Sequence, residues 1–357
     1  MQRMVRQEFY IPRLKQKLKK CVHNCKVCVI HKKQVCSQMM AALPAERSTF
    51  TQPFTHTGVD FAGPFQIKSS HIRSAPYLKG YACIFVCFAT KAVHLEACED
   101  LSTAAFKNTF SRFVGRRGLP KCMYSDNGRN FIGASNDFQN EFAEFLEHAP
   151  SDLQRKYTVE GFSWYFIPPG APHMGGLWEA AVKSVKTHFV KVAGSHKFTF
   201  QEFSTLLVRI EGVLNSRPLT PVSNDPEDLL ALTPGDFIIG RPIMAFPENP
   251  SAGLPIIARY EKLKILHHRF SQRWKDEYIH TLQKRYKWQT PERNLQIGDF
   301  VIVRDDQVPP AEWRMGRIVK LHPGTDDLVR VAEIKTQSGI ITRSIAKLCF
   351  LPFISNC

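Results

Sequence analysis

The pattern of apolar and polar positions in the first half of the chain predicts a series of short β-strands, of which 81–90 is expected to be buried. The pattern favours five strands, at 56–68, 81–90, 92–97, 121–125 and 161–167. Gly63-Pro64 interrupts the first of them, because proline cannot donate to a strand ladder. The segment 41–56 before them has Pro and small polar residues without periodicity, and we interpret it as a linker.

Apolar residues at helical spacing predict four helices between and after these strands. They are expected at 101–115, 136–148, 177–192 and about 200–214. Ser102 stands where a helix N-cap is expected. Strands interleaved with helices are typical of an α/β fold, here a mixed sheet with helices packed against it.

The last third of the chain has a different pattern. The stretch 218–258 is rich in Pro and Gly and indicates an extended connector, and 259–285 has helical spacing with many basic residues. Short β-rich runs follow at 300–304, 317–321, 328–335 and 340–344. With turn signals at Pro323-Gly324 and Ser338-Gly339, these runs predict a small β-barrel.

Charge is distributed unevenly along the 357 residues. The net charge of +16 divides into +9 in residues 1–40, zero in 41–254 and +7 in 255–357. Basic segments on both sides of a neutral centre favour binding to a polyanion, since phosphate contacts supply most sequence-independent affinity for nucleic acids. The alternative is that the charge only confers solubility.

Cysteine usage and apolar runs bear on the compartment. Ten Cys without regular spacing do not suggest a disulfide framework, so a reducing compartment is expected. The N-terminus has no apolar stretch typical of a secretory signal, and the longest apolar run, 81–89, is too short for a bilayer. We therefore expect an intracellular protein without a membrane partner.

Three acidic residues occupy positions where catalytic carboxylates are expected. Asp60 lies in the first strand, Asp126 ends a later strand before a tight Asn-Gly turn, and Glu179 opens a helix. Carboxylates from two strands and one helix can converge on a pair of Mg²⁺ ions, the usual arrangement for cutting and joining phosphodiesters. Taken singly, each residue has an alternative role in a turn or an N-cap.

Two lysines follow Glu179 on the same predicted helix face, and one histidine precedes it. Lys183 and Lys186 lie four and seven residues further on, and they are candidates for holding a DNA backbone. For Lys183 an ion pair with Glu179 is an equal alternative. His173, in the loop before the helix, is interpreted as a structural residue.

The motifs around the three carboxylates resemble the integrase core of retroelements. Gly-Val-Asp-Phe-Ala-Gly-Pro-Phe, Ser-Asp-Asn-Gly-Arg-Asn-Phe and Pro-Pro-Gly-Ala-Pro-His-Met-Gly-Gly-Leu-Trp-Glu carry this resemblance. Later runs, such as Leu-Asn-Ser-Arg-Pro-Leu-Thr-Pro and Trp-Arg-Met-Gly-Arg-Ile-Val, resemble more narrowly the BEL/Pao class of long-terminal-repeat retrotransposons. The resemblance covers nearly the whole chain.

The resemblance implies a domain order and a chemistry. It implies a partial zinc-binding segment at 1–40, a ribonuclease-H-like catalytic core at 50–240, and a basic helix with an SH3-like β-barrel at 255–353. Asp60, Asp126 and Glu179 would bind two Mg²⁺ or Mn²⁺ ions for 3′-end processing and strand transfer. Double-stranded DNA and further copies of the chain are the implied partners, and the nucleus, after a cytoplasmic phase, is the implied location.

Two further features keep alternatives open. Cys25 and Cys28 have the spacing of half a Zn²⁺ site, but the upstream histidines of such sites are not in this sequence, so unliganded thiols are the alternative. The 52 residues between Asp126 and Glu179 exceed the spacing of retroviral integrases, and we place the excess at 136–160.

Tryptophans in the basic C-terminal segment have two interpretations. The tryptophans could contact DNA, or they could belong to an aromatic core. The residues concerned are Trp274, Trp288 and Trp313, which stand among Arg273, Arg285 and Arg314. For the whole chain the alternatives to an integrase are a decayed or domesticated copy that binds DNA without catalysis, and a ribonuclease H.

Overall fold

The computed structural model divides the chain into two units. The described residues are 9–25, 43–70, 72, 74–151, 161–168, 172–194, 196–246, 259–283, 293–305 and 308–353. The first unit is Met1–Pro44 and the second is Ala45–Cys357. Each unit is described by itself below.

The described part of the first unit contains one basic helix, α2 (Leu14–Asn24). Its N-cap, Arg13, has a left-handed backbone and offers no side-chain hydrogen bond to the helix. Leu14 is the buried residue of this helix, while its lysines are exposed or partly exposed. A helix with so little burial derives little stability from packing.

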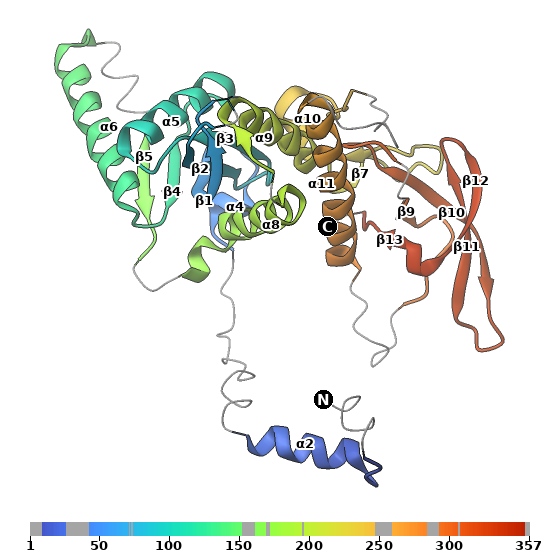
Figure 1. The fold of residues 1–357 in the computed structure, drawn as a ribbon. Helices are drawn as coiled ribbons and strands as arrows, with labels where there is room; N and C mark the ends of the chain where they lie inside the picture. The colour runs from blue at the N-terminus through green and yellow to red at the C-terminus, as the bar shows by residue number, and fades with distance from the viewer. Residues whose placement is uncertain are drawn as a thin grey trace. The chain divides into compact units, whose positions relative to one another are not determined.

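A mixed sheet forms the centre of the second unit (Figure 1). Its strands are β1 (His56–Lys68), β2 (Tyr77–Cys87), β3 (Val93–Cys98), β4 (Cys122–Ser125), β5 (Ser163–Phe166) and β6 (Phe198–Thr199). The order is β3-β2-β1-β4-β5, with β6 added beside the far end of β1. The first three strands are antiparallel, whereas β4 and β5 run parallel to β1. The prediction of a mixed sheet is confirmed.

Strand β1 contains the predicted interruption without ending there. The register with β2 shifts between Ala62 and Phe65, which pair with Ala82 and Gly80. Gly63-Pro64 occupies the shift, where the missing proline N–H costs no ladder hydrogen bond. The strand before the shift, with Asp60, stays in regular pairing with β2.

Helices pack on both faces of the sheet and produce two cores. They are α5 (Thr103–Arg117), α6 (Arg129–His148), α8 (Gly176–Ala193) and α9 (Phe200–Asn215). One core joins α8 and α9 to the sheet, and α11 (Arg259–Leu282) packs outside it through residues such as Phe270. The other core joins α5 and α6 to the opposite face, around Phe85 and Phe106. The α/β class expected from the sequence is therefore confirmed.

Capping residues explain where two of these helices begin. The Ser102 side chain accepts from the backbone N–H of Ala105 at 3.1 Å, as predicted for an N-cap. In α9, Thr199 and Glu202 form a reciprocal capping box. Both helices agree with their predicted positions within two residues.

Helix α6 begins seven residues before the predicted position. The Asp126 side chain accepts from the N–H of Gly128, and this turn leads directly into the helix. Its first turns bury Phe131 and Ala134 against the sheet. The residues around these two positions are mostly polar or small, so apolar residues do not recur there at helical spacing. The sequence therefore predicted only the later turns, 136–148.

The connector after α9 contains short elements. They are β7 (Thr220–Pro221), β8 (Ala231–Leu232) and α10 (Pro234–Ile239). A second capping box, Thr233 with Asp236, begins α10. The rest of the predicted connector, from 247 onward, lies outside the described residues.

A second, fully antiparallel sheet follows α11. Its strands are β9 (Phe300–Val303), β10 (Arg314–Pro323), β11 (Val329–Thr336), β12 (Gly339–Ser344) and β13 (Leu348–Phe350). The order is β12-β11-β10-β9-β13, so β12 and β13 are the sheet edges. The four predicted runs are confirmed as strands, whereas β13 was not predicted. Closure into an SH3-like barrel stays a prediction.

Contacts between α11 and the second sheet bury a charged side chain. The ammonium group of Lys275 donates to the carbonyl oxygens of Pro309 and Glu312, each at 2.7 Å. Its burial lowers its pKa to about 8. Ile279 of the same helix joins the core around Phe300. None of the helices in the described parts of the chain is long and apolar enough to cross a membrane.

Candidate active site

Asp60 lies in the central strand β1, opposite Ile84 of β2. Strand alternation puts it on the same face as Gly58, whose Cα faces Trp178 of α8. The N–H of Phe61 donates to Asp60 Oδ1 at 2.6 Å. This bond fixes the carboxylate close to the backbone of its own strand.

Asp126 follows directly after the last residue of β4, the parallel neighbour of β1. Its Oδ1 accepts from the N–H of Gly128 at 3.0 Å. Ser125 supports the turn, because its hydroxyl donates to the Asp126 carbonyl at 2.9 Å and accepts from Trp164 Nε1 at 3.0 Å. The Asp126 side chain is exposed, as a residue that receives a ligand needs to be.

Glu179 stands in the first turn of α8 and is exposed. The preceding residue, Trp178, is only 2% exposed and anchors the beginning of the helix against the sheet. A Cβ on Gly58 would lie 2.3 Å from Trp178 Cε3, so only glycine permits this close approach. The prediction from sequence did not include Gly58 and Trp178, although a glycine two residues before Asp60 is a signal for such an approach.

Two of the three carboxylates act electrostatically on the third, Asp60. Burial, followed by the negative charges of Asp126 and Glu179, raises the pKa of Asp60 to about 6. The hydrogen bond from Phe61 and the positive charge of Lys186 oppose this rise. The fold thus brings the three predicted residues into one electrostatic environment.

The same residues are not gathered into a closed ligand cluster. Among the residues that the structure describes, no three His, Cys, Asp or Glu side chains are placed closely enough to hold a metal ion. Carboxylates in one environment repel each other, and a divalent cation would offset that repulsion. Their oxygen donors suit Mg²⁺ or Mn²⁺ in chemical type.

Lys183 and Lys186 are both exposed on α8. Lys186 is the one whose charge acts on Asp60. The ion pairs among the described residues do not include one between Lys183 and Glu179. The alternative interpretation of Lys183 as an ion-pair partner is therefore not supported by the geometry.

The predicted N-terminal zinc half-site is only partly described. Cys25 is the C-cap residue of α2 and is partly exposed, whereas Cys28 lies outside the described residues. The side chain of His173 also lies outside them, although its backbone belongs to a 3-10 helix, η1 (Pro172–Gly175). The prediction of Zn²⁺ binding stays a prediction.

Two of the three C-terminal tryptophans belong to the core. Trp274 is 6% exposed and donates to Ser184 of α8, while Trp313 packs against it edge-on with ring centroids 6.1 Å apart. The interpretation as an aromatic core is therefore right for both, and contact with DNA is wrong for Trp274. Trp288 and Arg285 lie outside the described residues.

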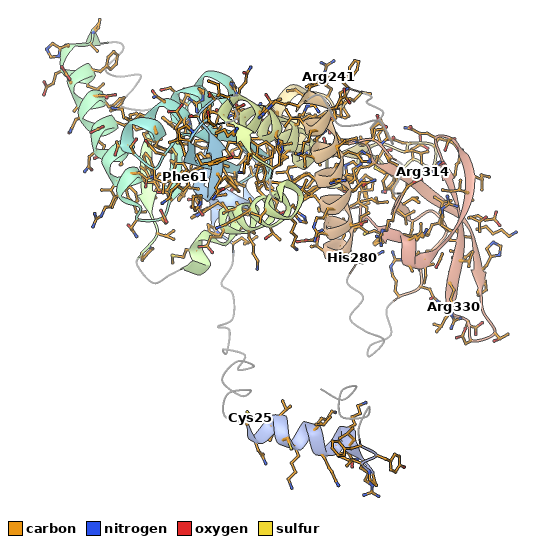
Figure 2. The ribbon with its side chains drawn as sticks, viewed as in Figure 1. Cys25, Phe61, Arg241, His280, Arg314 and Arg330 are labelled. Carbon is orange, nitrogen blue, oxygen red and sulfur yellow. The ribbon has the colours of Figure 1, made fainter. Side chains whose placement is uncertain are left out.

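Several arginines of the second sheet are held by acidic partners. Figure 2 shows Arg314 and Arg330 on this sheet. Arg314 pairs with Asp305, with 2.5 Å between Nη1 and Oδ2, and Arg330 pairs with Asp326. Arg273 on α11 is exposed instead. Of the predicted DNA contacts Arg273 and Arg314, the first therefore has the more accessible charge.

The described residues define an α/β protein in which an antiparallel sheet follows a central mixed sheet. Residues 258–351, which include α11 and the second sheet, match the model of a family of unknown function, DUF5641. No curated protein matches the chain. Among solved structures, the chain is similar to one from the simian T-cell lymphotropic virus intasome in complex with PP2A regulatory subunit B56 gamma. The identity is 12%, the match covers 95% of this chain and 92% of the other, and the TM-score is 0.37.

Proposed function

We propose that this protein is a retrotransposon integrase of the BEL/Pao type, a polynucleotidyl transferase with a ribonuclease-H-like core. The observation that carries the proposal is the placement of the three carboxylates, with Asp126 and Glu179 near enough to Asp60 that their charges add to burial in raising its pKa. Acidic residues on a central strand, on its parallel neighbour and on a helix over the same face support a site for phosphodiester chemistry.

The three carboxylates would hold two Mg²⁺ or Mn²⁺ ions. When bound, such ions activate the attacking water or hydroxyl and stabilise the leaving oxygen. The chain itself orients the donors, since Phe61 fixes Asp60 and Gly128 fixes Asp126 through backbone N–H groups. Near neutral pH, Asp60 retains its proton in part of the molecules, so cation binding would release that proton.

DNA is the proposed substrate, both as the element end and as the target. Exposed Lys183 and Lys186 extend from the carboxylates along α8, where they would contact phosphates. The basic flanks, +9 in 1–40 and +7 in 255–357, would add sequence-independent affinity. We further propose that the enzyme acts as a homo-oligomer in the nucleus after a cytoplasmic phase, and that Cys25 and Cys28 belong to a Zn²⁺ site.

A second candidate is an integrase-derived protein that binds DNA without catalysis. It is favoured by the absence, within the described residues, of a ready-made cluster of metal ligands. The two candidates share the basic surfaces and differ in whether the carboxylates perform chemistry.

A strand-transfer assay tests the proposal. Purified protein is incubated with a labelled duplex that mimics an element end and with Mg²⁺ or Mn²⁺, and Asp126→Asn is the matched control. Joined products that disappear in the variant are the expected result. Salt-sensitive DNA binding without joining would favour the non-catalytic candidate, and cleavage of RNA in a hybrid would favour a ribonuclease H.

A further inference from the structure

Four aromatic rings form a stacked column beside the carboxylates. From the inside outward they are Trp178, Phe88, Tyr124 and Tyr165. Successive centroids are 5.9, 4.7 and 5.3 Å apart, and successive planes are inclined by 13°, 25° and 20°. The rings come from α8, the loop after β2, β4 and β5, so only the fold brings them together.

The column lies on the face of the sheet that contains Asp60. Gly58 pairs with Tyr124, and Tyr124 pairs with Tyr165 across the parallel strands. Asp60 follows Gly58 by two residues on β1. Asp126 follows Tyr124 by two residues, directly after the end of β4. With strand spacings of about 4.8 Å and about 3.3 Å per residue, the Tyr165 Cα lies roughly 8 Å from that of Asp126 and roughly 12 Å from that of Asp60.

Exposure increases steadily along the column. Trp178 is 2% and Phe88 6% exposed, Tyr124 is partly buried, and Tyr165 is 51% exposed. Burial raises the pKa of Tyr124, so its phenol stays neutral beneath the outer ring. Tyr165 belongs to β5, which is the edge strand of this sheet among the strands that the structure describes. Its ring is therefore supported from one side and accessible from the other.

We propose that Tyr165 is a stacking site for an unpaired nucleobase of the DNA strand that enters the carboxylate site. This inference rests on the proposed function and specifies a substrate with a frayed or single-stranded end. An exposed ring held flat by a ring beneath it matches the face of a base, and stacking of this kind tolerates any sequence. Because an unpaired strand extends by at least the duplex rise of about 3.4 Å per nucleotide, the estimated separations put that base within about four nucleotides of the reacting phosphate.

Charge on the same face favours nucleic acid over an apolar peptide as the occupant. Glu179 adjoins Trp178 in the chain, and Lys186 acts electrostatically on Asp60 of the same face. A strand whose base stacks on Tyr165 would thus extend its phosphates toward a lysine and the proposed metal site. Stacking and phosphate contact together are typical of sites for single-stranded nucleic acid.

The experiment compares two DNA ends, one fully paired and one with four unpaired nucleotides. Binding is measured by fluorescence anisotropy with Ca²⁺, and joining is measured separately with Mg²⁺. Wild-type protein should bind the unpaired end more tightly, and Tyr165→Ala should lose about tenfold in affinity for that end alone. Tyr165→Phe should retain the preference, because it retains the ring.

Tyr77→Ala is the matched control. Tyr77 is also an exposed tyrosine of this sheet, 43% exposed, and it stands at the far end of β2 from Asp60. Its substitution should leave both affinities unchanged. Thermal unfolding of each variant establishes that it is folded, and 5-iodouracil in the unpaired strand should crosslink to Tyr165 in wild-type protein.

The outcomes separate this inference from the proposed function. If the wild type neither binds nor joins DNA, both are overturned. If it joins DNA while Tyr165→Ala keeps the preference for unpaired ends and the crosslink forms elsewhere, the stacking site alone is overturned. An equal loss on paired and unpaired ends also overturns it, since a merely structural residue would produce that result.

Discussion

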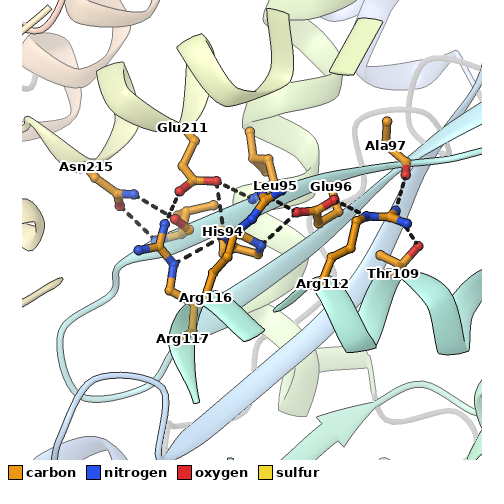
Figure 3. Close-up of polar contacts among 11 residues, drawn as sticks. His94, Leu95, Glu96, Ala97, Thr109, Arg112, Arg116, Arg117, Glu211 and Asn215 are labelled. Atoms are coloured by element: carbon orange, nitrogen blue, oxygen red, sulfur yellow. Dashed lines mark hydrogen bonds and ion pairs between the residues drawn. The ribbon is translucent and has the colours of Figure 1, made fainter. Parts of the chain in front are cut away.

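His94 on β3 lies 3.3 Å from Glu211 on α9, measured from Nδ1 to Oε2. Figure 3 shows this contact within a polar network that joins β3, α5 and α9. Glu211 also accepts from the N–H of Leu95, and Asn215 bonds both backbone groups of Val93. Side chains of α9 therefore bond the backbone groups at the outer edge of β3, which no other described strand pairs with.

His94 should make the stability of this network depend on pH. Burial disfavours its charged form, but hydrogen bonds with Glu211 and Glu96 outweigh burial and raise its pKa, against the nearby charge of Arg117. A raised folded pKa contributes stability below the unfolded value of about 6.5, and this contribution is lost as pH rises through the folded pKa.

His94→Gln should remove that dependence and cost about 1–3 kcal/mol at pH 6. Denaturant unfolding between about pH 5.5 and 8.5 measures both quantities. Wild-type stability should fall over this range relative to the variant. If the free energy of unfolding changed with pH in the same way in both proteins, the pH dependence would not come from His94.

Asp60 should also make stability fall as pH rises, but over a lower pH range than His94. Its pKa is about 6 in the folded protein against an ordinary value of 3.8, so the folded state binds the proton more tightly. The free energy of unfolding therefore decreases as pH rises from about 4 to about 6 and then stays constant. Asp60→Asn should stabilise the metal-free protein by about 1–3 kcal/mol at neutral pH while abolishing strand transfer.

Denaturant unfolding with and without Mg²⁺ measures this effect. Mg²⁺ should stabilise the wild type above pH 6 and should not stabilise Asp60→Asn to the same extent. If Asp60→Asn were less stable than the wild type at neutral pH, the ionised Asp60 side chain would not destabilise the metal-free folded state, and the prediction would be wrong.

Lys186 should lower the pKa of Asp60 more than Lys183 does. Its positive charge opposes the rise caused by burial and the two other carboxylates. Lys186→Gln should move the Asp60 titration above 6, and Lys183→Gln is the matched control on the same helix. Carboxyl NMR titration measures the shift, and equal shifts in both variants would contradict the assignment of Lys186 to the site.

Gly58 should be intolerant of any side chain. A Cβ there would lie 2.3 Å from Trp178 Cε3 and 3.2 Å from Phe88 Cε1. Gly58→Ala should displace the start of α8, with Glu179, at a cost of about 1–3 kcal/mol. Gly115→Ala in α5, where no atom lies within 4 Å of the new Cβ, should instead stabilise the protein slightly.

Thermal unfolding and strand transfer together measure this prediction. Activity should be lost in Gly58→Ala and retained in Gly115→Ala. Full activity of Gly58→Ala would show that the position of Glu179 does not depend on the packing of Trp178.

Local signals predicted most elements because their causes lie within a few residues of each other. The Ser102 cap and the position of β1 are examples, and both are confirmed. The start of α6 and the strand β13 are two of the parts that escaped prediction, each for its own reason. The first turns of α6 show no clear helical period, and β13 is a strand of three residues whose pairing with β9 comes from distant sequence.

The tryptophans show where local pattern stops being informative. Trp274 and Trp313 stand among basic residues, which suits a nucleic-acid surface as well as a core. Trp274 donates to Ser184 of α8, and Trp313 donates to Ser216 at the end of α9. These contacts with residues distant in the sequence show that both rings belong to the core. Solvation of a side chain depends on these distant neighbours, so the sequence left both interpretations open.

The sequence by itself determined the order of the main strands and helices, and it placed Asp60 in a strand, Asp126 after one and Glu179 at a helix start, since periodicity, caps and turns act locally. Tertiary structure alone decided that burial raises the pKa of Asp60 to about 6, that the charge of Lys186 opposes this rise, and that four rings stack on the same face of the sheet. Burial and charge interactions are set by groups distant in the chain, and only packing brings those groups within a few ångströms of each other.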